Sequence, residues 1–168
     1  MGELILNLVV LGAVALATFT DLRARRIPNV LTAVAAAIGL AGNGLLFGVD
    51  GLVASLAGWG LGIALLFPLF VLRGLGAGDV KLIAALGALK GPEFVFFTCL
   101  WAGIGGGVMA VAGLLRSRKL GVALAHLYLF RFLPGPSNSF ITAGRLPYAP
   151  AIALGAALTL GGVRWIGG

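Results

Sequence analysis

Charged side chains are scarce in this sequence. Only 10% of its 168 residues are Asp, Glu, Lys or Arg, whereas 60% are hydrophobic and the mean hydropathy is +1.10. A soluble globular domain carries about 25% charged residues. This deficit excludes a soluble globular protein and predicts an integral membrane protein, and the length of the chain suits one compact bundle.

Cysteine and histidine are scarcer still, with one residue of each, Cys99 and His126. A lone cysteine excludes a disulfide within the chain and a cysteine metal cluster. A nucleophilic triad would depend on His126 alone, and we interpret that residue as an interfacial histidine in an amphipathic segment. We therefore predict neither a metal site nor a cofactor.

A basic start is also lacking. Glu3 is the only charge in the first twenty residues, and the arginines follow this apolar run instead of preceding it. A cleaved signal peptide has the opposite order. The sequence therefore predicts a retained first span whose N-terminus lies outside.

Long apolar runs, in contrast, are abundant. Five runs have about the 17–25 residues that a helix needs to cross a bilayer, and they cover 4–20, 30–48, 51–72, 94–115 and 147–166. The run 79–92 is apolar but short for a crossing at about 1.5 Å per residue. It is either a sixth span or a re-entrant piece.

The basic residues favour a sixth span. The net charge of +7 does not indicate nucleic-acid binding, because the basic residues stand in short clusters between apolar runs. If 79–92 crosses, ten of the 12 basic residues are cytoplasmic and only Lys90 and Arg164 lie outside. We therefore predict an all-α, polytopic membrane helix bundle of about six transmembrane helices, with both termini outside. The segment 120–133 is predicted to lie in the cytoplasmic interface.

Glycine is frequent, with 28 residues, and two pairs have the small-xxx-small spacing that lets helices approach closely. These pairs are Gly58 with Gly62 and Gly103 with Gly107. Dimerisation and packing inside the bundle both fit the spacing. We favour packing inside the bundle, and the oligomeric state stays open.

Acidic residues number only five. In the predicted topology, Glu3, Asp50 and Glu93 fall in or near external loops, whereas Asp21 and Asp79 both lie at the cytoplasmic membrane boundary. A carboxylate near the bilayer is costly and therefore indicates a function. Each also has a simpler interpretation, because Asp21 suits an ion pair with Arg25 and Asp79 suits a helix N-cap after Gly78.

Together, the two aspartates suit peptide hydrolysis. Two neighbouring carboxyl groups do not both ionise cheaply, so the charged one can act as general base on water and the protonated one can polarise a carbonyl. Gly76 and Gly78 would let the backbone turn sharply and let another chain approach Asp79. Because both aspartates border loops that suit flexibility, we expect the carboxyl groups to stand apart until substrate binds.

These motifs resemble a known family. The stretch DLRARRIPN, residues 21–29, resembles the first-aspartate motif of type IV prepilin peptidases, and GAGDVKL, residues 76–82, resembles their G-x-G-D-x-K motif. The stretch RLPYAPAIALGA, residues 145–156, resembles the last span of the short prepilin peptidases of tight-adherence (Flp) pilus systems. The likeness covers most of the chain in motif order and spacing.

The resemblance implies an aspartic intramembrane endopeptidase of the bacterial inner membrane. It would cleave the basic leader of prepilins and pseudopilins at the cytoplasmic face, and its partners would be those signal peptides and membrane lipid. Asp21 and Asp79 would be catalytic, and Gly76 and Gly78 would shape the active-site turn. The residues that could support the motif or the substrate are Lys81, Pro28 and Asn29. Lys81 also suits a lysine that snorkels to the interface.

The sequence departs from the long members of that family, which carry a cytoplasmic domain with cysteine pairs and also N-methylate the pilin. We therefore expect one peptidase domain over residues 1–168, with no separate N-methyltransferase domain. Presenilin-type G-x-G-D proteases share only the second motif. The competing function is a non-catalytic transporter or pilus assembly scaffold, although a transporter would place its charges nearer the bilayer midplane.

Overall fold

The structure is a computed structural model that describes residues 2–71, 75–116 and 148–162. Within these ranges every regular element is a helix, which confirms the predicted all-α class. The elements are α1 (Gly2–Ala24), α2 (Asn29–Val71), α3 (Ala77–Lys90), α4 (Pro92–Arg116) and α6 (Ala149–Gly162). The segment 120–133, for which we predicted an interfacial position, lies outside the described residues together with His126.

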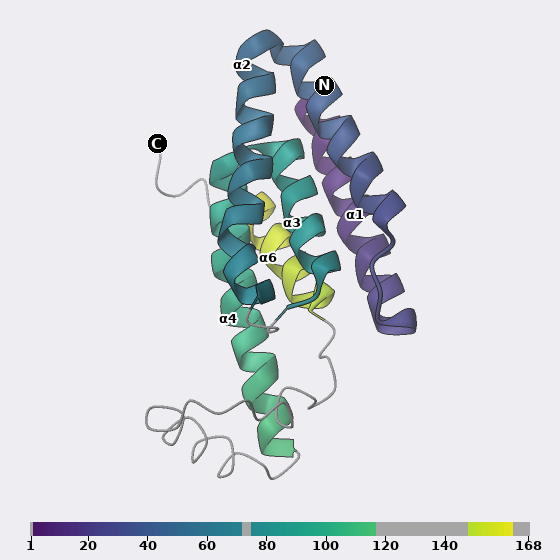
Figure 1. Cartoon of the computed structure of the whole chain (residues 1–168), viewed down its shortest axis with the longest axis vertical. Coiled ribbons are helices and arrows are strands. Elements are labelled where there is room, and N and C mark those ends of the chain that lie inside the picture. Colours follow the sequence, from purple (N-terminus) through teal and green to yellow (C-terminus); the bar gives the residue numbers. More distant parts are fainter. Residues whose placement is uncertain (1, 72–74, 117–147, 163–168) are drawn as a thin grey trace.

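Helix α2 is a hairpin of two helical arms. The arms meet at Gly48, whose φ of 66° and ψ of −145° are not helical, and the chain reverses there (Figure 1). A side chain rarely adopts this positive φ, so glycine suits the turn. The two arms correspond to the predicted spans 30–48 and 51–72, and the sequence divided them correctly.

Within the described ranges, three helices are long and apolar enough to cross a membrane, namely Gly2–Ala24, Asn29–Val71 and the Pro92–Met109 part of α4. Large apolar side chains cover the outside, and Val30, Leu45 and Val49 are 73%, 87% and 75% exposed. So much exposed apolar surface suits lipid and not water. The chain is therefore an integral membrane protein, while the count of six spans and the side of the termini stay predictions.

Helix α3 forms the centre of the bundle. Its residues from Leu82 to Leu89 are all buried. Glycines of α2 allow this burial, because a Cβ atom on Gly58 would lie 2.2 Å from the carbonyl oxygen of Gly87, and one on Gly62 would lie 2.9 Å from Ala84 Cα. The prediction that the first small-xxx-small pair packs inside the bundle is confirmed.

The second glycine pair behaves differently. Gly103 and Gly107 are exposed on α4, and a Cβ atom on either would meet no described atom within 4 Å. The prediction that this pair packs inside the bundle is therefore wrong for the described residues. The spacing alone could not show this, because both pairs share it and only the rotation of each helix distinguishes them.

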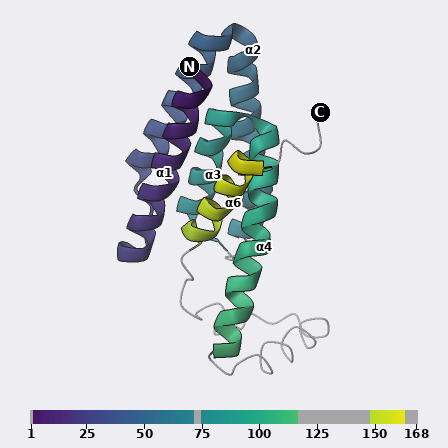
Figure 2. The same ribbon diagram turned by 180° about the vertical axis from the view of Figure 1, so that it is seen from behind.

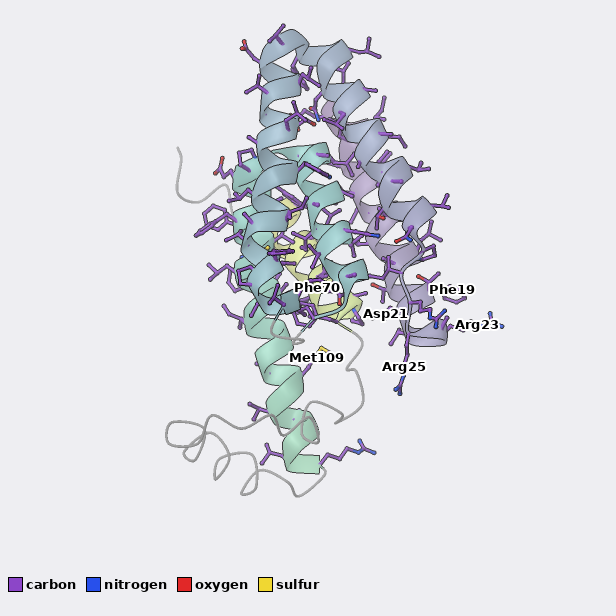
Figure 3. The ribbon with its side chains drawn as sticks, in the orientation of Figure 1. Phe19, Asp21, Arg23, Arg25, Phe70 and Met109 are labelled. Atoms are coloured by element: carbon purple, nitrogen blue, oxygen red, sulfur yellow. The ribbon has the colours of Figure 1, made fainter. Side chains whose placement is uncertain are left out.

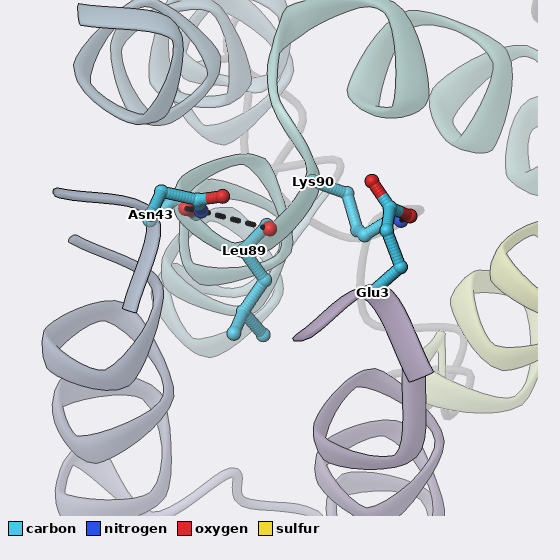
Figure 4. A network of polar contacts seen from close by, with 5 residues as sticks. Glu3, Asn43, Leu89 and Lys90 are labelled. Carbon is cyan, nitrogen blue, oxygen red and sulfur yellow. Dashed lines mark hydrogen bonds and ion pairs between the residues drawn. The ribbon is translucent and has the colours of Figure 1, made fainter. Parts of the chain in front are cut away.

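Polar contacts fix the C-terminal end of α3 (Figure 4). The Asn43 side-chain amide donates to the carbonyl oxygens of Ala88 and Leu89, at 3.1 Å each, and the Ser55 hydroxyl also donates to Ala88. These bonds satisfy carbonyls that lack a partner at a helix end. Beside them, Lys90 pairs with Glu3 at 2.8 Å, so Glu3 is an ion-pair partner at the start of α1.

Candidate active site

Asp21 is positioned by the last turn of α1. It is only 8% exposed, and the helix ends three residues later. The chain leaves the helix at Arg25, whose φ of 50° is left-handed and whose N–H donates to the carbonyl of Asp21 at 2.8 Å. The alternative interpretation, an ion pair between Asp21 and Arg25, is wrong. The Asp21 carboxylate instead accepts the backbone N–H of Ala149 at 3.2 Å, while Arg25 points away from the bundle (Figure 3).

Asp79 is positioned by the first turn of α3. The alternative interpretation, Asp79 as the N-cap, is wrong, because Gly76 is the N-cap and Asp79 is the third residue of the helix. Its Oδ2 accepts the N–H of Gly76 at 3.0 Å, a donor that has no partner within the helix. A carboxylate in a first turn also lies at the positive end of the helix dipole.

The two aspartates lie at the same end of the bundle. Asp21 lies in the last turn of α1 and Asp79 in the first turn of α3, and Ile27 after α1 contacts Gly78 beside Asp79. Each carboxylate accepts its own backbone N–H, from Ala149 and from Gly76 respectively. Within residues 2–71, 75–116 and 148–162, no three His, Cys, Asp or Glu side chains are placed to share a metal ion.

The loop after Asp21 packs directly on the turn before Asp79. A Cβ atom on Gly78 would lie 3.1 Å from Ile27 Cβ, so glycine allows this close approach. Further along both motifs, Lys81 Nζ donates to Asn29 Oδ1 at 3.0 Å. Pro28, between Ile27 and Asn29, is exposed, and its carbonyl accepts the N–H of Thr32 in the first turn of α2.

The predicted role of the two glycines needs correction. Among the described glycines, only Gly48 and Gly91 have a positive φ, so neither Gly76 nor Gly78 is needed for an unusual backbone turn. Close approach is the better reason for Gly78, and the approaching chain is the protein's own Ile27. At Gly76, an added Cβ atom would lie 3.1 Å from Asp79 Oδ2.

Comparison with known families identifies the chain. The sequence model of the type IV leader peptidase family matches residues 8–111, a range that contains both aspartate motifs. The chain belongs to the type IV leader peptidase family. The resemblance drawn from the motifs is confirmed at that level, and the protein is a peptidase. No curated protein and no solved structure matches it.

Sequence reasoning missed one contact of the candidate site. The first residues of α6 reach Asp21, although we predicted 147–166 only as a span. The contact is made by the main chain of Ala149, and a backbone N–H leaves no signature in residue type. Only the placement of α6 between α1 and α4 reveals it (Figure 2).

Proposed function

We propose that this peptidase is an aspartic endopeptidase in which Asp21 and Asp79 act together on one peptide bond. The observation that carries the proposal is that the segment after Asp21 packs on the turn that holds Asp79, through Ile27 and Gly78, inside the range matched by the family. Asp21 is nearly buried and Asp79 is half-buried. Neither is paired with a basic side chain in the described part of the chain.

The chemistry follows from two carboxyl groups at one place. One ionised carboxylate takes a proton from water, which attacks the scissile carbonyl, while the protonated partner donates a hydrogen bond to the carbonyl oxygen. The tetrahedral intermediate then collapses when the leaving amine takes up a proton and the C–N bond breaks. The backbone N–H groups of Ala149 and Gly76 hold one carboxyl oxygen of each residue, which supports a fixed orientation.

The substrate follows from the family and from the location of the pair. We infer that the enzyme removes the basic leader of type IV prepilins and pseudopilins of the Flp type, at the cytoplasmic face of the bacterial inner membrane. Basic residues near the pair support that side, because Arg23 and Lys81 lie close in sequence to Asp21 and Asp79, while Lys90 lies at the opposite end of α3.

A six-span topology supports this placement. Helix α3 has 14 residues, about 21 Å at the usual rise, so its crossing requires a locally thin bilayer. Helix α3 begins beside Asp79 and ends at Lys90, which pairs with Glu3 at the start of α1. The end of α3 therefore lies at the same end of the bundle as the start of α1. With α3 counted as a span, α1, the two arms of α2, α4 and α6 complete six passes.

Asparagine substitutions test this function. Asp21→Asn and Asp79→Asn are each expressed in cells with an Flp-type prepilin, and processing is followed as a mobility shift on a gel. Each variant should abolish processing, because asparagine neither accepts a proton from water nor keeps a carboxyl proton. Asp50→Asn, at an exposed position near the Gly48 turn, is the matched control and should process normally.

The rates are compared at equal amounts of each variant in the membrane fraction. Processing by either Asp21→Asn or Asp79→Asn at the rate of the Asp50→Asn control would refute the aspartic mechanism. A scaffold without catalytic activity predicts that outcome.

A further inference from the structure

The start of α6 meets Asp21 although α6 lies beyond the range matched by the family, which ends at residue 111. Ala149 is the first residue of α6 and is 0% exposed. Its N–H donates to Asp21 Oδ2 at 3.2 Å, across 128 residues of sequence. Among the described residues, this is the only hydrogen bond to the Asp21 carboxylate.

The donor is not interchangeable with its neighbours. The next residue, Pro150, has no N–H, and the N–H groups of Ala151 and Ile152 already donate to the carbonyl of Tyr148, at 3.0 and 3.1 Å. The N–H of Ala149 is therefore the one first-turn donor of α6 that is directed at Asp21. A small rotation or shift of α6 would remove it.

Tyr148 fixes the position of this donor. Its hydroxyl donates to the carbonyl of Ala102 on α4 at 3.0 Å. Its ring lies directly on Gly106, since a Cβ atom there would come within 2.3 Å of Tyr148 Cε2. The ring and the hydroxyl thus bind the start of α6 to α4 at two successive turns of α4, immediately before Ala149.

We propose that the start of α6 is a positioning element for Asp21, with Tyr148 as the positioning residue and Gly106 as the site that accepts its ring. This inference rests on the proposed catalytic role of Asp21. The N–H of Ala149 orients the carboxylate, because a hydrogen bond to a charged acceptor is stronger than a neutral one.

Removal of the donor is the first test. Ala149→Pro deletes the N–H at the first helical position, where proline is well tolerated. The purified full-length enzyme is assayed on a model prepilin with a short basic leader, a glycine and a hydrophobic segment of about 20 residues. We expect kcat to fall about tenfold or more with little change in KM.

Displacement of Tyr148 is the second test, with a matched control on the same helix. Gly106→Ala forces the ring away and should lower kcat about tenfold or more with little change in KM. Gly107→Ala, the next residue, adds the same methyl group on an exposed face and should leave kcat at the wild-type value. Tyr148→Phe keeps the ring, loses only the bond to Ala102, and should give an intermediate loss.

The outcomes separate this inference from the proposed function. If Asp21→Asn abolishes cleavage while Gly106→Ala and Tyr148→Phe match Gly107→Ala, the positioning role is refuted and the aspartic mechanism stands. A raised KM with an unchanged kcat in Ala149→Pro also refutes it, because a misplaced carboxylate lowers kcat. If Ala149→Pro or Gly106→Ala does not fold, Tyr148→Phe decides, since it removes a single hydroxyl.

Discussion

Alanine at Gly58 should displace the helix that carries Asp79. The Cβ atom would lie 2.2 Å from the carbonyl oxygen of Gly87 and 2.6 Å from the carbonyl carbon of Gly91, so the closest contact must lengthen to at least 3.0 Å. These neighbours are backbone atoms, which cannot rotate away as a side chain can. Relief therefore requires α2 and α3 to separate.

The size of the effect can be bounded. Overpacking of a tight core costs about 1–3 kcal/mol, and the backbone contact at Gly58 favours the upper part of that range. Gly60→Ala is the matched control, because it lies on the same arm of α2, is exposed, and meets no described atom within 4 Å. Both substitutions gain up to about 1 kcal/mol from the higher helix propensity of alanine. The difference between their free energies of unfolding therefore measures the cost of the contact between Gly58 and α3.

Two assays measure this difference. Unfolding in detergent by increasing fractions of SDS should give Gly58→Ala a lower free energy of unfolding than Gly60→Ala by about 2 kcal/mol or more. Cleavage of a model prepilin by the folded fraction should also fall, since a displacement of about 1 Å at a catalytic group can cost about a hundredfold in rate. Equal stability and equal activity of the two variants would refute the packing of α3 described above.

Four further predictions concern the backbone at Arg25, two asparagine side chains and the membrane topology. Arg25→Gly should raise the free energy of unfolding by about 1 kcal/mol, because it removes a side chain from a left-handed backbone. Arg26→Gly is the control and should not raise it, so equal effects of the two substitutions would contradict the strain at Arg25. Asn43→Leu should lower the free energy of unfolding by about 1–2 kcal/mol in the same SDS titration, because the amide donates to the last carbonyls of α3. Asn7→Leu should leave the free energy of unfolding unchanged or raise it, since the Asn7 side-chain oxygen is buried without a partner among the described residues. A decrease in that free energy as large as the decrease in Asn43→Leu would contradict this reasoning. In a background without Cys99, single cysteines at 22–29 should be labelled from the cytoplasm and those at 49–50 and 91–93 from outside, and the reverse pattern would overturn the proposed topology.

Much of the fold could be predicted because lipid imposes a simple rule on helix composition. Apolar length placed the helices, and the chain reversal at Gly48 falls between two runs that the sequence separated. The rotation of each helix was not predictable from glycine spacing, since Gly58 faces α3 and Gly103 faces outward with the same motif. Which side of a helix faces the core depends on the helices around it, and a local sequence pattern does not identify those helices.

The site was predictable only where side-chain chemistry is visible. Two aspartates in an apolar chain are conspicuous because burial of a charge is costly, and the structure brings them to one end of the bundle. The pairing of Lys81 with Asn29 joins two predicted motif residues, although the sequence did not show that they contact each other. The backbone donor of Ala149 and the room for Tyr148 at Gly106 depend on main-chain geometry, so no residue type indicated them.

Whether the two carboxyl groups stand apart before substrate binds stays a prediction. Each is held by a backbone N–H from a different segment, Ala149 for Asp21 and Gly76 for Asp79. We expect a substrate peptide to bring both onto one scissile bond. If so, a ligand that mimics the transition state binds tightly only when both aspartates contact it.

The most direct test of the central claim is therefore the binding of a transition-state analogue. A prepilin-derived peptide in which a hydroxyl-bearing tetrahedral carbon replaces the scissile carbonyl is titrated against the purified wild-type enzyme and against Asp21→Asn and Asp79→Asn. We predict that the wild-type enzyme binds the analogue at least about a hundredfold more tightly than the matching uncleaved peptide, and that each single substitution removes this preference. A preference that survives in either variant would show that Asp21 and Asp79 do not act on the bond together.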